Sequence, residues 1–149
     1  MADFHQNGII TTLHGLYEGF DREAYQSALE RRLAEYGRQL PICLLLPCLH
    51  SEMHNERVLG NIVSEIQGVN YIHSVIVALG GAQDENQFRE IRDYFERLRT
   101  PERDVKIVWV DGPRIQEVFQ KIAAREIPVG VQGKGQSVWI SLGYIFARE

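Results

Sequence analysis

The residues from Ile42 to Glu52 constrain the fold more than any other part of the chain. They read Ile-Cys-Leu-Leu-Leu-Pro-Cys-Leu-His-Ser-Glu, a continuous apolar run that stops at a proline and gives way to polar residues. A short run of this kind is typical of a strand buried on both faces, and we expect it to be the central strand of a parallel sheet. Because proline has no N–H group to give to a neighbouring strand, Pro47 should lie at the carboxyl end of this strand. In open α/β sheets that end is where ligands bind.

Composition narrows the class of protein. The chain has 149 residues, of which 44% are hydrophobic and 24% charged, as expected for one globular domain with a real core. The net charge is −4 and no basic block occurs, which argues against a nucleic-acid partner. No apolar run is long enough to span a bilayer, and the N-terminus lacks the features of a signal peptide. We therefore expect a cytoplasmic protein.

The two cysteines, Cys43 and Cys48, lie five residues apart on the same expected strand. An odd separation points them to opposite faces of the sheet, so they cannot form a disulfide with each other. We expect Cys43 to be a buried free thiol. Cys48 is closer to the end of the strand and could line a pocket, but nothing marks it as a nucleophile.

A helix is expected before the first strand. Residues 1–20 have no clear periodicity and are interpreted as a loosely attached arm, so that residues 1–40 form an arm and a helix. Asp21 can cap this helix and Gly37 should end it. The apolar stripe of the helix should lie across the sheet. The stripe consists of Tyr25, Leu29, Leu33, Tyr36 and Leu40.

The chain after the first strand alternates between helical and strand patterns. The apolar spacing predicts helices over about 54–67 and 85–99 and from Pro113 to about 122, with strands over 71–79 and 105–110. This order predicts an α/β protein: a Rossmann-like parallel sheet with right-handed crossovers and helices on both faces, preceded by the N-terminal helix.

The last segment has a different character. An extended piece over 127–132 leads to Gly133-Lys134-Gly135 and then to a helix over about 136–147 that is apolar almost all round. Such a helix must be buried on most of its surface. We expect either that further chain covers it, in which case residues 41–149 are the N-terminal part of a longer domain, or that it forms an oligomer interface.

Gly133-Lys134-Gly135 is the clearest chemical signal. Glycines let a backbone approach a ligand closely, a helix start offers free N–H groups, and Lys134 adds a positive charge, all of which suit a phosphate or pyrophosphate. The segment is neither a Walker A loop nor the dinucleotide fingerprint. A flexible turn with a solvated lysine is the alternative. Gly80-Gly81, after the second strand, is open to the same two interpretations.

Other chemistries have less support. His50 and His54 are four residues apart, but Ser51 stands where a zincin would have glutamate, which argues against a metal site. His73 is interpreted as a partly buried, hydrogen-bonded histidine. No serine lies in a nucleophile elbow, and no Asp-x-Asp occurs. Asp84 and Asp111 are interpreted as caps of the helices that follow them.

Two motifs resemble a known family. Residues 44–52 resemble the first strand of GT-A fold glycosyltransferases, in which apolar residues precede Pro-Ala-Leu-Asn-Glu-Glu. Residues 133–139, Gly-Lys-Gly-Gln-Ser-Val-Trp, resemble the Gly-Lys-Gly-x-x-x-Trp stretch of one branch, the glucosyl-3-phosphoglycerate synthases and their mannosyl relatives. The motifs stand in the family's order, with β-α-β-α units between them. The resemblance covers about residues 41–149.

The resemblance implies a nucleotide-sugar site built from three segments. The first motif would line the base and ribose, with its second acid helping to hold the loop. The glycine pair after the second strand would border the nucleotide, and the Gly-Lys-Gly segment would reach and shape the approach to the pyrophosphate. The implied site residues are Pro47, Cys48, Leu49, Ser51, Glu52, Gly80, Gly81, Gly133, Lys134 and Gly135.

Two positions depart from the family pattern. Leu79 stands where many relatives have an acid that contacts the base, and Ser51 replaces the first acid of the first motif. Uridine and guanosine donors therefore both stay open, as do glucose and mannose.

The resemblance also implies what the chain lacks. The family's metal-binding Asp-x-Asp follows a strand that comes after the Gly-Lys-Gly helix, and this chain ends at that helix. We thus expect the nucleotide-sugar-binding half of a retaining glycosyltransferase, inactive in transfer by itself, with catalytic residues not identifiable and no metal site of its own. The whole enzyme would use Mg²⁺ or Mn²⁺ to move a hexose from a nucleotide diphosphate donor to a small acceptor such as 3-phosphoglycerate. The alternative is a Rossmann-like module that binds a nucleotide or a protein without catalysis.

Overall fold

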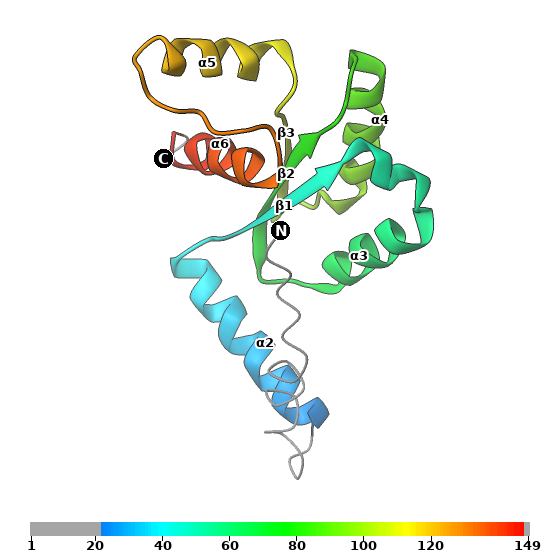
Figure 1. The fold of residues 1–149 in the computed structure, drawn as a ribbon. Helices are drawn as coiled ribbons and strands as arrows, with labels where there is room; N and C mark the ends of the chain where they lie inside the picture. Colours follow the sequence, from blue (N-terminus) through cyan, green and yellow to red (C-terminus); the bar gives the residue numbers. More distant parts are fainter. Residues whose placement is uncertain (1–21, 148–149) are drawn as a thin grey trace, which may run out of the picture.

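In the part of the chain that the structure describes, three parallel strands carry helices on both faces (Figure 1). The computed structural model describes residues 22–147, so the arm expected over 1–20 and the cap Asp21 lie outside the described residues. The predicted fold class and the order of elements after the first strand are confirmed. In chain order the elements are α2 (Arg22–Gln39), β1 (Ile42–Leu49), η1 (His50–His54), α3 (Glu56–Gly68), β2 (Ile72–Gly80), α4 (Glu85–Phe95), η2 (Glu96–Leu98), β3 (Asp104–Trp109), α5 (Pro113–Ala123) and α6 (Lys134–Phe146).

The central strand of the described sheet is β2, not β1. The strand order is β1-β2-β3, so the expectation that β1 is central was wrong. From Val75 onward every residue of β2 is buried, whereas most of β1 is only half-buried. Pro47 also lies inside β1, opposite Ala78, and the strand continues to Leu49. An edge position fits, because an edge strand can leave the missing N–H of a proline without a partner.

Each face of the sheet has its own core, as the alternation of β2 requires. On one face Val75 and Val77 pack with residues of α3 and α4, among them Val63 and Phe95. On the other face Ile76 packs with residues of α5 and α6. Figure 1 shows α3 and α4 on one side of the strands and α5 and α6 on the other. The prediction of helices on both faces is therefore confirmed.

The helix α2 does not lie across the sheet. It points away from the strands (Figure 1), and all five residues of its expected apolar stripe are at least 37% exposed. Its sequence carries charged residues on most sides, and its mean hydropathy is low, so little apolar surface would be gained by burying it. The expectation of a helix laid on the sheet was wrong.

Gly37 anchors the end of α2 instead of ending the helix. It lies two residues before the last residue, Gln39, and is buried. A Cβ atom at this position would come within 2.5 Å of Cε1 of His73. His73 in turn accepts a hydrogen bond from the Ile42 N–H group at 3.3 Å through Nδ1, as expected for a partly buried histidine. A side chain at position 37 would thus push the His73 ring out of its place between α2 and β2.

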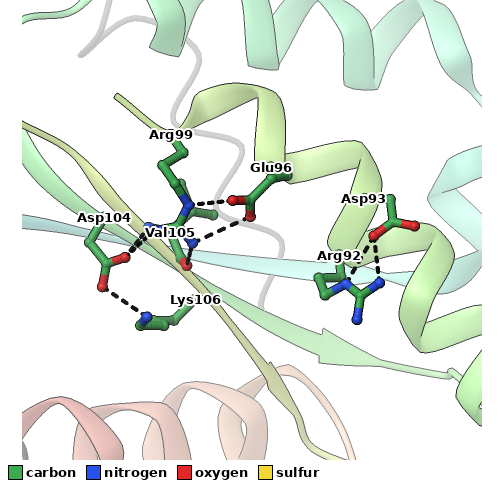
Figure 2. Close-up of polar contacts among 7 residues, drawn as sticks. All are labelled: Arg92, Asp93, Glu96, Arg99, Asp104, Val105 and Lys106. Atoms are coloured by element: carbon green, nitrogen blue, oxygen red, sulfur yellow. Dashed lines mark hydrogen bonds and ion pairs between the residues drawn. The ribbon is translucent and has the colours of Figure 1, made fainter. Parts of the chain in front are cut away.

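A group of charged side chains joins η2 to the start of β3 (Figure 2). Arg99 forms ion pairs with Glu96 and Asp104 and donates to the Val105 carbonyl at 2.7 Å. Lys106 Nζ lies 3.3 Å from Asp104 Oδ2. Burial by itself would raise the pKa of Asp104, but the hydrogen bonds and charges of Arg99 and Lys106 outweigh it and lower this pKa.

Arg103 turns inward from the same loop. Its side chain is 5% exposed and donates to three backbone carbonyls, those of Ile66 at 2.9 Å, Ile72 at 3.3 Å and Val69. These carbonyls end α3 and begin β2. A buried guanidinium is tolerable when its N–H groups are satisfied in this way, and it ties three elements together.

The helix α6 begins at Lys134, two residues before the expected start, and is only partly buried. Ile140 and Ser141 face the sheet and are buried, while Trp139, Leu142 and Phe146 are 46%, 40% and 68% exposed. The sequence predicted an apolar helix, and an uncovered apolar face is what the described residues show. Within residues 22–147 no helix is long and apolar enough to cross a membrane.

Candidate functional site

A cleft of about 350 Å³ lies where β1 and β2 end and α6 begins. Parallel strands bring their carboxyl ends to one edge of the sheet, and such edges bind ligands in open α/β folds. Two expected site residues, Ser51 and Gly135, do not line the cleft. The expected residues that do are Pro47, Cys48, Leu49, Glu52, Gly80, Gly81, Gly133 and Lys134.

The first wall is the end of β1 and the turn after it. The Leu49 N–H group donates to Glu52 Oε2 at 2.9 Å, which fixes the turn from the strand into η1. Leu49 itself is 53% exposed, so this wall offers an apolar surface next to a carboxylate.

The thiol of Cys48 is a poor nucleophile. It is buried, and burial, followed by the hydrogen bond and charge of Glu52, raises its pKa to about 12. Since the thiolate is the nucleophile, this cysteine is not poised for covalent chemistry. Cys43 is exposed, which corrects the expectation of a buried thiol and follows from its place on an edge strand. Both thiols are free, as the odd spacing predicted.

The second wall is the glycine turn after β2. Gly81 has a φ of +76°, a conformation that favours glycine. A Cβ atom on Gly80 would lie 3.3 Å from Leu49 Cδ2 and so would narrow the space between the first two walls. The turn is held from β3, because Trp109 Nε1 donates to the Ala82 carbonyl at 3.0 Å.

The third wall is the start of α6. Gly133 precedes the helix with a φ of +155°, and Lys134 is its first residue. A Cβ atom on Gly133 or Gly135 would meet nothing within 4 Å, so the approach to the helix N-terminus is open. Ser137 Oγ donates to the Gly133 carbonyl at 3.1 Å and holds the turn. Lys134 is exposed and has no ion pair with another described residue.

Asp111 is a site residue that the sequence interpretation missed. It was expected to cap α5, but Gly112 occupies the cap position and no side chain caps this helix. Asp111 instead lines the cleft. An acid placed directly after a strand was the available signal. The cleft is also lined by four residues that no local pattern marks: Ala78, Val110, Gln132 and Ser137.

The prediction for the other acid, Asp84, is confirmed. Its side chain caps α4 by accepting hydrogen bonds from two backbone N–H groups.

The described residues form no metal centre. Nε2 of His50 lies 3.0 Å from Oε2 of Glu90, and the ring centroids of His50 and His54 are 6.4 Å apart. Among residues 22–147 no three His, Cys, Asp or Glu side chains gather as a metal site would require. Glu52 already accepts a hydrogen bond from the turn it closes. The described residues around the cleft therefore do not fit a divalent ion.

The cleft offers different chemistry along its length. Lys134 and the N–H groups at the start of α6 provide a positive end that suits an anion such as a diphosphate. Pro47 and Leu49 provide apolar surface, and backbone groups of the two turns lie beside it. A ligand with a flat, partly polar group joined to phosphates complements this arrangement.

Comparison with known proteins agrees with the two sequence motifs. A glucosyl-3-phosphoglycerate synthase from Persephonella marina is 34% identical over 147 residues, and one from Methanococcoides burtonii is 31% identical over 142 residues. The chain resembles glucosyl-3-phosphoglycerate synthases. The aligned residues cover 99% and 95% of this chain but 34% and 32% of the two synthases, so the chain spans about a third of their length. No family model and no solved structure matches the chain.

Proposed function

We propose that this chain binds the nucleotide diphosphate sugar used by a glycosyltransferase similar to the glucosyl-3-phosphoglycerate synthases. The observation that carries the proposal is spatial: three segments far apart in the sequence, each expected at a nucleotide site, line one cleft. The similarity of nearly the whole chain to two synthases supports the same function.

The charges of the cleft indicate how the ligand lies. The diphosphate would lie against Lys134 and the first turn of α6, where a positive side chain and free N–H groups meet. The base and ribose would lie between the β1 turn and Gly80-Gly81, away from that positive end. Gly133 and Gly135 would leave room for the phosphates, because side chains there would stand in the approach.

The complete reaction is proposed for the whole protein. It would move a hexose from the donor to a small acceptor such as 3-phosphoglycerate, a compound that forms part of the names of the two synthases. A divalent ion, Mg²⁺ or Mn²⁺, would supply charge stabilisation for the departing diphosphate. The ligands of that ion would come from residues other than 22–147, and residues 1–149 alone would carry out no transfer. We propose a cytoplasmic location, where nucleotide sugars and 3-phosphoglycerate are found together.

Calorimetric titration of the 149-residue chain tests donor binding. UDP-glucose, GDP-glucose and GDP-mannose are titrated into the wild type, and we expect one of them to bind. Lys134→Ala should weaken that binding by about tenfold or more, equal to about 1.4 kcal/mol, since a phosphate contact is lost. Lys121→Ala is the matched control, because Lys121 lies exposed on α5 with Glu117 as its partner. Equal affinity of all three proteins would contradict the proposal.

A second candidate function rests on the exposed face of α6. Trp139, Leu142 and Phe146 leave apolar surface uncovered in the described residues, which favours a module that binds a protein. Transfer activity of a longer chain that contains these residues would decide for the glycosyltransferase. If chains of every length tested bind nucleotide but transfer no sugar, the result would favour the non-catalytic binding module.

A further inference from the structure

We propose that Asp111 is the positioning residue that sets the glycine turn after β2 and the segment before α6 at the right separation for a nucleotide sugar. This inference rests on the proposed function. It would act through the backbone of one wall and the side chain of the other.

The two oxygens of the Asp111 carboxylate hold two different walls. Oδ2 accepts a hydrogen bond from the Gly81 N–H group at 2.6 Å. Oδ1 accepts from Nε2 of Gln132 at 2.7 Å, the residue just before Gly133. Both distances are short, as expected when a charged oxygen is the acceptor. One side chain thus joins segments that lie about 50 residues apart in the sequence.

The carboxyl end of β3 is built to place this carboxylate. Trp109, two residues earlier, holds the same turn by its bond to the Ala82 carbonyl. The turn from 109 to 112 closes with a bond from the Gly112 N–H group to the Trp109 carbonyl, at 3.1 Å. A Cβ atom on Gly112 would lie within 2.6 Å of the indole ring, so only glycine fits at 112. Asp111 therefore projects from a tightly closed turn and not from a loose loop.

The charge of Asp111 predicts opposite changes in ligand affinity for a positioning residue and for a bystander. A carboxylate that lines a cleft for an anion repels that anion, so a bystander at this position would weaken binding. Removing a bystander should then leave affinity unchanged or improve it. If Asp111 positions the walls, its removal should weaken a ligand that touches both walls, in spite of the lost repulsion.

The two roles also differ by ligand. A nucleotide sugar would touch both the Gly80-Gly81 turn and the start of α6. Inorganic pyrophosphate would touch only the positive end at Lys134, so its binding does not depend on the separation of the walls. A general loss of structure would weaken both ligands alike.

Titration of four variants with the two ligands tests the proposal. Asp111→Ala should weaken the nucleotide sugar by about tenfold or more and leave pyrophosphate unchanged or bound more tightly. Asp111→Asn keeps one acceptor oxygen, and Gln132→Ala removes one of the two bonds, so each should give a smaller loss. Glu117→Gln removes an equal charge from the exposed face of α5 and should change neither affinity. Thermal unfolding confirms that each variant is folded.

Each outcome decides the inference. Nucleotide-sugar binding by Asp111→Ala at wild-type strength or tighter would overturn it, whether or not pyrophosphate binds strongly enough to measure. Equal weakening of both ligands would also overturn it. If Asp111→Ala does not fold, Asp111→Asn and Gln132→Ala decide by the same comparison. A wild type that binds no nucleotide sugar would contradict the proposed function itself, and the inference with it.

Discussion

Cys48 shows how a residue can line a binding cleft without taking part in chemistry. Its thiol lies in the wall formed by the end of β1, yet burial and the nearby Glu52 raise its pKa to about 12. At neutral pH nearly all of this residue is protonated, and a thiol is a poor nucleophile. The cleft is thus suited to reversible binding and not to a covalent intermediate at Cys48.

The two cysteines should differ sharply in reactivity. At pH 8 we expect iodoacetamide to modify Cys43, which is exposed, and to leave Cys48 unmodified for as long as the protein stays folded. Mass spectrometry of the tryptic peptides checks this. In urea both cysteines should react, which serves as the control. Rapid labelling of folded Cys48 would show that its environment differs from the one described.

Single residues also show what a sequence can and cannot reveal about the cleft. The segments Pro47–Glu52 and Gly133-Lys134-Gly135 were recognisable because their chemistry is local: a strand end, a helix start, glycines and a lysine. The role of Asp111 was not, because a carboxylate after a strand caps a helix or holds a distant turn depending on which groups the fold brings near it. Gln132 had no local signal at all.

At the scale of elements, the sequence predicted whether a segment is a helix or a strand more easily than where that element lies in the fold. β1 is a continuous apolar run and β2 is apolar from Val75 to Leu79, but the order of strands in a sheet depends on the crossovers between them and not on either run. The apolar stripe of α2 likewise predicted a helix, but a stripe does not say what covers it, and here it stays exposed. The alternation of helices and strands, by contrast, followed directly from hydrophobic spacing.

Arg103 should be the most sensitive charged residue for the packing of elements. Arg103→Ala removes a side-chain donor from three carbonyls at the junction of α3 and β2, of which the Ile66 carbonyl keeps a bond from the Val69 N–H group. We expect the free energy of unfolding to fall by about 2–4 kcal/mol. Urea unfolding followed by circular dichroism measures it. Arg92→Ala is the control and should cost less than about 0.5 kcal/mol, since Arg92 is exposed and, among residues 22–147, its ion pair is with Asp93. A similar small loss for both would contradict the assigned role.

At the scale of the whole molecule, the parallel sheet explains why distant segments meet. Each β-α unit returns the chain to the same edge, so the ends of β1, β2 and β3 and the segment before α6 all border one cleft. The chain spans about a third of the length of the two synthases that it resembles.

The uncovered face of α6 leads to a prediction about association. Association of two or more copies through this helix stays a prediction. If it occurs, the 149-residue chain should sediment with a mass that rises with protein concentration. Replacing Trp139 and Phe146 by serine should give a monomer with unchanged helix content, since both are exposed. Val131→Ser, at an apolar position that is 89% exposed elsewhere, should leave association unchanged. A wild-type chain that sediments as a monomer at every concentration would contradict association through α6.

The measurement that tests the central claim most directly is a titration of the ¹⁵N-labelled wild-type chain with the nucleotide sugar that binds in calorimetry, followed by NMR. We predict saturable shifts of the backbone signals of Gly80, Gly81, Gly133 and Lys134, while the signals of α2 stay in place. Shifts confined to other parts of the chain, or no shifts at millimolar ligand, would show that this cleft does not bind the donor.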